Sequence, residues 1–261
     1  MRQFKLIWAL FKMKTARQTA FRLGFFGPLF VDGTLFALQM LMFSAIYAHV
    51  DEIAGWGKGQ MLLFIGTFSL IDALNMTIFF FGLNNLTSLI KSGDFDGYLT
   101  RPMNPLLRVS LENVSLGSAP LIAVSAAIIA YAARLMGGTD IWHALGYLAL
   151  VVMMLLLWYD IMLLLRCIAF FAISVASAER VEGALLEMCL MLPGPAFKGG
   201  FKLVFTVLLP YGIIATVPTQ FFAGLLTGSA FLRAAATVAA FTVLSVALFR
   251  IGCKNYKSAS S

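Results

Sequence analysis

Long apolar runs separated by short polar segments dominate this chain. The runs long enough to cross a bilayer as helices cover about 28–49, 60–90, 111–136, 144–170 and 231–251. A transmembrane helix needs about 20 mainly apolar residues. The run at 60–90 would be about 45 Å long as a helix, so we expect it to tilt or to project beyond the bilayer. The pattern predicts a single all-α membrane domain over 1–261.

The first span is expected to begin at Pro28, because proline suits the first turn of a helix. The region before it, 1–24, is basic and places Phe4, Ile7, Trp8 and Phe11 on one helical face. This pattern predicts an amphipathic helix lying in the membrane interface. We expect no secretory signal peptide, since the region lacks a cleavable apolar core.

The region between 176 and 228 allows two layouts. In the first, residues 201–224 form the fifth span and 176–200 form a cytoplasmic loop. In the second, a short fifth span covers about 178–195, and residues 199–218 enter the membrane from outside and return. Hydropathy alone favours the first layout, although Pro210 and Pro218 interrupt its span.

Both layouts give six spans with the two termini on one side. Lysine and arginine gather on that side, with six of them in 1–24 alone. Cytoplasmic loops of membrane proteins carry such an excess. We therefore expect a multi-pass protein of the cytoplasmic (inner) membrane with both termini in the cytoplasm.

The composition supports the membrane assignment and excludes several functions. Hydrophobic residues make up 61% of the 261 residues and charged residues only 12%, against about 25% charged in a soluble domain. The net charge of +7 comes from residues between apolar runs, so it indicates topology and lipid headgroup contacts rather than nucleic-acid binding. The cysteines, Cys167, Cys189 and Cys253, have no disulfide-framework or zinc spacing.

We expect no catalytic site, metal or bound cofactor in this chain. It has no Gly-x-x-x-x-Gly-Lys-Ser/Thr loop to hold nucleotide phosphates. Its only histidines, His49 and His143, fall near the predicted outer surface without an acidic or cysteine cluster. The chain is therefore predicted not to be an enzyme.

Polar side chains inside the apolar runs are candidate functional residues. Asp32 opens the first span, Asp72 lies deep in the second, and Asp160 lies in the cytoplasmic half of the fourth. Charges at such depth are costly, so they should face the bundle, a partner subunit or a wet cavity. They could line a translocation path, or they could be hydrogen-bonded carboxyls that hold two helices together. For Asp72 both interpretations stay open, for Asp160 the structural one is favoured, and Asn75 is expected to bond between helices.

The polar segment 91–110 is a candidate docking element. Pro102 or Pro105 can start a short helix there, flanked by Arg101 and Arg108. A compact helix on the cytoplasmic side could bind a soluble partner, whereas a solvated connector is the plainer interpretation. The acidic residues at its start are Asp94 and Asp96.

Three stretches make the sequence resemble the type-two ABC transporter permeases. Ser92–Leu107 is similar to the Gly-x-hydrophobic-Asp…Arg-Pro-x-x-Pro loop of one branch of that family. Leu208–Pro210 with Val217-Pro218 is similar to its paired-proline signature before the last span. Asn255–Ser258 resembles its C-terminal Arg-Tyr-x-Ser ending.

The resemblance implies a fold and a mechanism. Such permeases have an N-terminal interfacial helix, six spans, a coupling helix after the second span and a re-entrant hairpin before the sixth. They pair as homodimers or heterodimers, and each half sits on a separate ATPase subunit that binds ATP and Mg²⁺. Carried onto this chain, the ATPase-coupling residues are Asp94, Asp96, Arg101, Pro102, Pro105 and Arg108, and the hairpin contains Pro210 and Pro218. The resemblance therefore selects the re-entrant layout over the one that hydropathy favours.

The predicted function is that of a permease subunit of an ATP-driven exporter. An amphipathic or apolar substrate would suit the apolar and methionine-rich runs, including Phe79–Phe81, Met40 and Met42. The alternatives are a channel or secondary carrier that needs no ATP, a membrane scaffold of an ABC-like complex without transport, and an intramembrane enzyme. No internal repeat favours the carrier, and no catalytic cluster favours the enzyme.

Overall fold

The computed structural model describes residues 22–138, 140–172 and 176–256. Within these ranges the regular elements are helices, which confirms the all-α membrane class. The predicted interfacial helix lies outside the described residues for 1–21, while Arg22–Gly24 belong to the first long helix. The longer helices are α2 (Arg22–Ile46), α3 (Lys58–Asn75), α4 (Phe81–Ser92), α7 (Ala119–Leu135), α8 (Ile141–Cys167), α9 (Ala176–Met191) and α12 (Gly228–Asn255).

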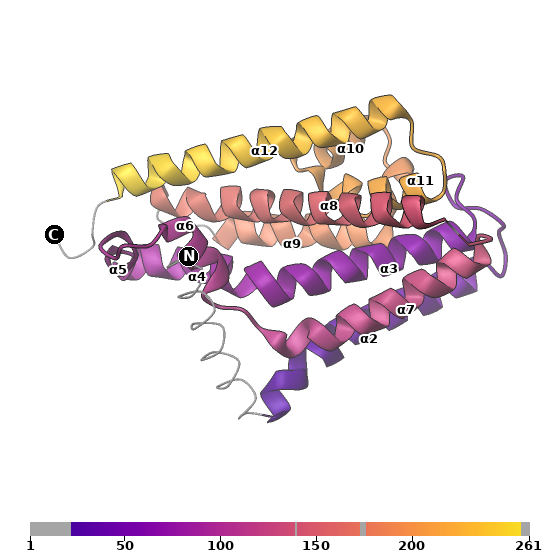
Figure 1. Ribbon diagram of the computed structural model, residues 1–261, viewed down its shortest axis with the longest axis horizontal. Helices are drawn as coiled ribbons and strands as arrows, with labels where there is room; N and C mark the ends of the chain where they lie inside the picture. The colour runs from indigo at the N-terminus through magenta and orange to yellow at the C-terminus, as the bar shows by residue number, and fades with distance from the viewer. Residues whose placement is uncertain (1–21, 139, 173–175, 257–261) are drawn as a thin grey trace.

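The helices form a layered bundle (Figure 1). In that view α12 forms one side, α8 and α9 follow, then α3, and α2 with α7 form the opposite side. α3 packs closely against α7, and α8 packs against α12. At Gly66 of α3 an added Cβ would lie 2.9 Å from Ile129 Cγ1, so the small residue permits the close approach of α7.

Among the described residues, five helical segments are long and apolar enough to cross a membrane: Leu29–Ile46, Lys58–Ser92, Leu116–Leu135, Ile141–Phe170 and Gly228–Asn255. The first of these segments begins at Leu29, next to the expected Pro28, but its helix begins earlier, so Pro28 lies inside α2. A proline there removes one helical hydrogen bond, and this loss does not end the helix.

The region between α9 and α12 is bent. Gly199–Leu208 and Pro210–Phe222 meet at 80° and would be a sixth span only if counted as one broken segment. The bend falls at Leu209, which has a non-helical backbone (φ −132°, ψ 83°) directly before Pro210. The chain thus has no straight helix over 201–224. The preceding α9 has 16 residues, which is short for a span, so the six-span layout stays a prediction.

The second span contains a π-helix, η1 (Met76–Phe80), between α3 and α4. There the carbonyl of Thr77 accepts a hydrogen bond from the backbone N–H of Ser115, at 2.9 Å. Single π-turns inside α-helices often occur at functional sites. This one ties the middle of the second span to the connection that leads into α7.

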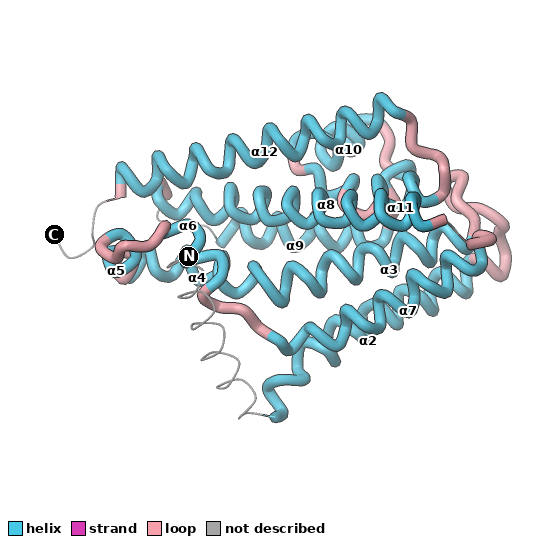
Figure 2. Tube along the Cα trace, viewed as in Figure 1, coloured by secondary structure: helices cyan, strands magenta, loops and turns pink. Residues whose placement is uncertain are grey.

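Most loops lie at the two ends of the bundle (Figure 2). One end carries the short helices α5 (Asp96–Leu99) and α6 (Pro105–Leu111), with the C-terminal end of α12 beside them. The other end carries α11 (Thr216–Phe222) and the turn between α2 and α3. The polar segment and the bent region therefore occupy opposite halves of the molecule.

Candidate coupling segment and buried polar network

Residues 93–111, called the coupling segment below, form an ordered structure rather than an open loop. Gly93 ends α4 in the left-handed conformation (φ 82°), which glycine adopts without steric cost. The side-chain oxygen of Asn104 accepts a hydrogen bond from the N–H of Leu106 at 2.9 Å, and Pro105 occupies the first turn of α6. This cap and proline are a common way to begin a helix, so α6 starts at Pro105 rather than at Pro102.

An aromatic cluster attaches the coupling segment to the ends of the long helices. The ring of Phe95 is fully buried. Its centroid lies 5.4 Å from those of Phe170 and Tyr256 and 6.3 Å from that of Phe249. At Gly252 of α12, an added Cβ would lie 2.4 Å from Phe170 Cδ2, so the cluster needs a glycine there. Edge-to-face rings of this kind stabilise packing beyond their buried area.

Arg108 lies inside the segment and not on its surface. Its Nε contacts Glu112 Oε2 at 2.9 Å, and its Nη1 donates a hydrogen bond to the carbonyl of Gly97 at 3.0 Å. The guanidinium carbon also lies 4.0 Å from the centroid of the Tyr98 ring. Burial, together with the nearby Glu112 carboxylate, raises the pKa of the Tyr98 phenol to about 12. Arg108 therefore joins α5 to α6, which places it as a positioning residue.

The other predicted coupling residues lie nearer the surface. Arg101 and Pro102 are exposed, with the exposed apolar side chains of Leu99 and Leu107 on the flanking helices. Asp94 is exposed and accepts a hydrogen bond from Ser92 Oγ at 2.7 Å. Asp96 begins α5, and its carbonyl accepts a hydrogen bond from Thr100 Oγ1 at 3.1 Å. Arginine is enriched at protein–protein interfaces, so an exposed arginine near exposed apolar side chains forms a surface suited to a protein partner.

The segment also contacts the membrane-spanning helices directly. A Cβ added at Gly82 of α4 would lie 2.2 Å from the carbonyl oxygen of Val109, so the backbones of α4 and α6 touch. The hydroxyls of Ser110 and Tyr159, from α6 and α8, lie 2.8 Å apart. A displacement of α6 would therefore act on both α4 and α8.

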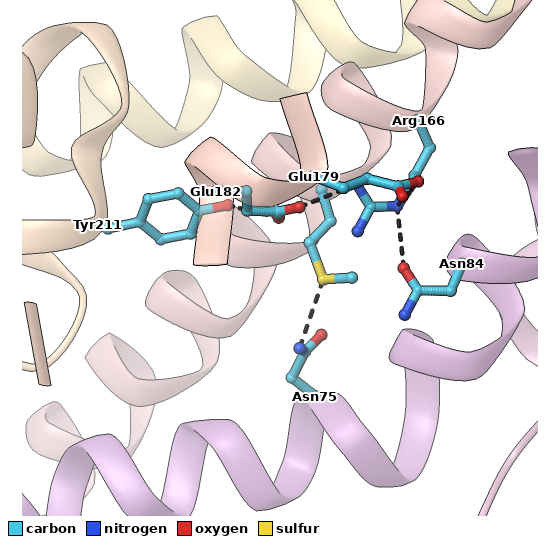
Figure 3. A network of polar contacts seen from close by, with 7 residues as sticks. Asn75, Asn84, Arg166, Glu179, Glu182 and Tyr211 are labelled. Atoms are coloured by element: carbon cyan, nitrogen blue, oxygen red, sulfur yellow. Dashed lines mark hydrogen bonds and ion pairs between the residues drawn. The ribbon is translucent and has the colours of Figure 1, made fainter. Parts of the chain in front are cut away.

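A buried polar network joins α4, α8, α9 and the bent region, residues 199–222 (Figure 3). Arg166 of α8 donates a hydrogen bond from Nε to Asn84 Oδ1 at 2.9 Å. Its Nη1 pairs with Glu182 Oε2 at 2.8 Å, and Tyr211 donates to Glu182 Oε1 at 2.8 Å. Arg166 is 5% exposed and Glu182 4%. Such a pair is costly to break, because the remaining charge would be buried without a partner.

No pattern in the sequence indicated this network. Neither Arg166 nor Glu182 was among the candidate residues of the sequence. The two residues stand on separate helices, and the hydropathy pattern does not say which faces of those helices meet. Tyr211 lies in the region where the sequence allowed two layouts.

The candidate polar residues within the predicted spans differ in their burial and in their hydrogen-bond partners. Asp160 accepts hydrogen bonds from Thr242 Oγ1 at 2.5 Å and Ser245 Oγ at 2.7 Å, so it joins α8 to α12. Asn75 donates from Nδ2 to Met162 Sδ at 3.5 Å, also between helices. Asp72 of α3 is half-buried and interacts electrostatically with Asp32 of α2.

The hairpin prolines lie at helix starts. Pro210 opens the short helix that follows the bend, and Pro218 lies near the start of α11. In the part of the chain that the structure describes, no three histidine, cysteine or acidic side chains gather as a metal site.

Comparison with known proteins gives one match. A family model described as "ABC-2 family transporter protein" matches residues 34–260. Neither a curated protein nor a solved structure matches the chain. The matched residues contain the coupling segment, the buried polar network and the bent region.

Proposed function

Because the chain belongs to the ABC-2 transporter family, of which it is a membrane-spanning permease, we propose that it is the permease subunit of an ATP-driven exporter. It moves an amphipathic or apolar substrate outward across the cytoplasmic membrane. ATP and Mg²⁺ bind to a separate ATPase subunit, and this chain pairs with a second copy or with a related permease. Both of its termini lie in the cytoplasm.

The coupling segment carries the proposal. The segment is ordered and directly follows the second span. Its exposed residues include Arg101 and Pro102 and, on either side of them in the sequence, the apolar Leu99 and Leu107. A solvated connector would not need the buried Phe95 or the inward-facing Arg108 to hold its shape. The ATPase docks on this surface, and Arg108 maintains it.

Contacts between side chains support a route for force from the segment into the membrane. The segment touches α4 at Gly82 and α8 at Tyr159. From α4, Asn84 bonds to Arg166, which pairs with Glu182, which in turn accepts a hydrogen bond from Tyr211 in the bent region. Closure of the ATPase pair would thus reach residues 199–222, the re-entrant hairpin of the proposal, through the packing of α6 on α4 and then through the polar contacts from Asn84 to Tyr211.

Affinity purification of the tagged chain from its native membranes in mild detergent, followed by an ATPase assay, tests the proposal. We expect a soluble ATPase subunit to co-purify, with turnover that vanadate inhibits. Purification of the chain alone, without nucleotide hydrolysis, would instead favour a channel or secondary carrier. Arg101→Glu is the matched interface variant and should remove the co-purifying ATPase.

A further inference from the structure

Two carboxyl groups lie level with one another in adjacent spans, and the coupling route does not use them. Asp32 is fourteen residues from the end of α2 at Ile46, and Asp72 is fourteen residues from the start of α3 at Lys58. Each is therefore about 21 Å along its helix from the same end of the bundle. α2 packs against α3, and the two carboxylates interact electrostatically.

Asp32 differs from the other buried charged side chains of the described residues. Arg108, Asp160, Arg166 and Glu182 all have hydrogen-bond or ion-pair partners. Asp32 is 9% exposed, and its Oδ2 is buried without a hydrogen-bond partner in the described part of the chain. Asp72, in contrast, is only half-buried, so a ligand can reach the pair from the side of Asp72.

The elements around the pair carry further charged and titratable groups. Arg22 and Lys58 lie at the ends of α2 and α3, and Tyr131 and Arg134 lie in the last turns of α7. On α8, Tyr147 bonds to Thr67, Tyr159 to Ser110, and Asp160 to α12. α9 touches α2 through a hydrogen bond from Gln39 to Leu190. The remaining titratable groups on α8 and α9 are His143, Arg166, Cys167, Glu179, Arg180, Glu182, Glu187 and Cys189.

Two neighbouring carboxylates in an apolar setting cannot both ionise cheaply, because each raises the cost of charging the other. Such a pair keeps one of the two carboxyls protonated, unless a bound cation compensates the second negative charge. Val31 and Leu35, beside Asp32 on α2, are exposed apolar side chains. A ligand that reaches Asp72 past apolar surfaces of this kind must therefore be apolar around its charge.

We infer that Asp32 and Asp72 form a binding site for a monovalent lipophilic cation, which displaces the proton that one of the two carboxyls carries when the site is empty. Asp72 contacts the ligand, and Asp32 supplies the second negative charge beneath it. The inference that the bound cation is the transported substrate rests on the proposed export function. The binding itself does not depend on an ATPase.

Binding of radiolabelled tetraphenylphosphonium to the purified full chain in detergent tests the site. Tetraphenylborate has the same shape and the opposite charge, so it controls for apolar partitioning. We expect saturable binding of the cation at pH 8, weaker binding at pH 5 because protons compete, and no saturable binding of the anion. Asp72→Asn and Asp32→Asn should each weaken cation binding at least tenfold, and Asp72→Glu should retain most of it.

Asp160→Asn is the matched control, because it neutralises a membrane carboxyl whose oxygens already have hydroxyl partners. It should leave cation binding unchanged. Saturable binding of tetraphenylborate, no binding of the cation, or full cation binding in either Asp72→Asn or Asp32→Asn overturns the inference. If a variant fails to fold, the charge selectivity and pH dependence of the wild type decide alone. A chain that binds the cation but purifies without an ATPase would keep the site and refute the export function.

Discussion

Arg166 and Glu182 form an ion pair at 2.8 Å between α8 and α9, with both side chains almost wholly buried. Tyr211 donates a hydrogen bond to the same carboxylate. The pair thus fixes a short helix and a bent region that hydropathy alone does not position. Its energetic role is testable because Glu179 offers a weaker version of the same contact.

Removal of Glu182 should destabilise the protein strongly. Glu182→Ala leaves the Arg166 guanidinium buried without its partner, a change that costs about 3–5 kcal/mol. Glu179 lies 3.9 Å from Arg166 Nε and is 41% exposed, so Glu179→Ala should cost less than about 1 kcal/mol. Thermal unfolding of the purified chain in detergent measures both. An equal loss in the two variants would show that the buried pair is not a stabilising contact.

Replacement of both partners should recover stability without recovering transport. In Arg166→Met with Glu182→Met, neither member of the pair is left as a buried charge without its partner, and such double replacements are often neutral in stability. If the pair transmits force to the bent region, the double variant folds but loses most substrate-stimulated ATPase activity with its partner. Wild-type activity in this variant would remove the network from the coupling route.

The two arginines of the coupling segment should respond differently to charge reversal. Arg101 is exposed, so Arg101→Glu should weaken ATPase co-purification at least tenfold without lowering the thermal midpoint. Arg108 is enclosed by Glu112, Gly97 and Tyr98, so Arg108→Glu should lower both. Quantitative pull-down and thermal unfolding of the same preparations check this.

The control for charge reversal is Arg233→Glu, an exposed arginine at the opposite end of α12. It should change neither co-purification nor stability. Retained ATPase binding in Arg101→Glu would mean that the docking surface lies elsewhere.

Much of the fold could be predicted from the sequence, because a chain that crosses a membrane forms either helices or a closed barrel, and long apolar runs favour helices. Prolines and glycines in the sequence also indicated the turns of the coupling segment and the interruption of the apolar run at Pro210, whereas the re-entrant layout came from the family resemblance. The sequence did not predict which side chains of different helices contact one another. Arg108 was predicted as a docking residue from its charge and its place beside Pro105, yet α5 folds back and encloses it. Asp32 and Asp72 were both identified, but their pairing depends on how α2 and α3 are aligned, which a uniform apolar pattern does not encode.

Gly82 should tolerate no larger side chain, because α6 lies against it. An added Cβ would be 2.2 Å from the carbonyl oxygen of Val109, so Gly82→Ala must push α6 away and should cost about 1–3 kcal/mol. Gly97→Ala is the matched control, since nothing lies within 4 Å of a Cβ there. We expect a lower thermal midpoint and weaker ATPase binding for the first variant only. Identical behaviour of the two would contradict the close contact of α4 with α6.

The coupling segment should lose stability at alkaline pH through Tyr98. Its pKa is raised from 10.0 to about 12 in the folded protein, mainly by burial and then by Glu112. A raised pKa means that the fold favours the neutral phenol, so this contribution is complete below pH 10 and is lost as the pH rises from 10 to about 12. Tyr98→Phe keeps the ring beneath Arg108 but cannot ionise, so its thermal midpoint should fall less than that of the wild type over this interval. Tyr131→Phe, at an exposed position on α7, serves as the control and should follow the wild-type curve. Parallel curves for wild type and Tyr98→Phe would mean that the phenol ionises in the folded protein without cost, and that its burial beside Glu112 does not favour the neutral form.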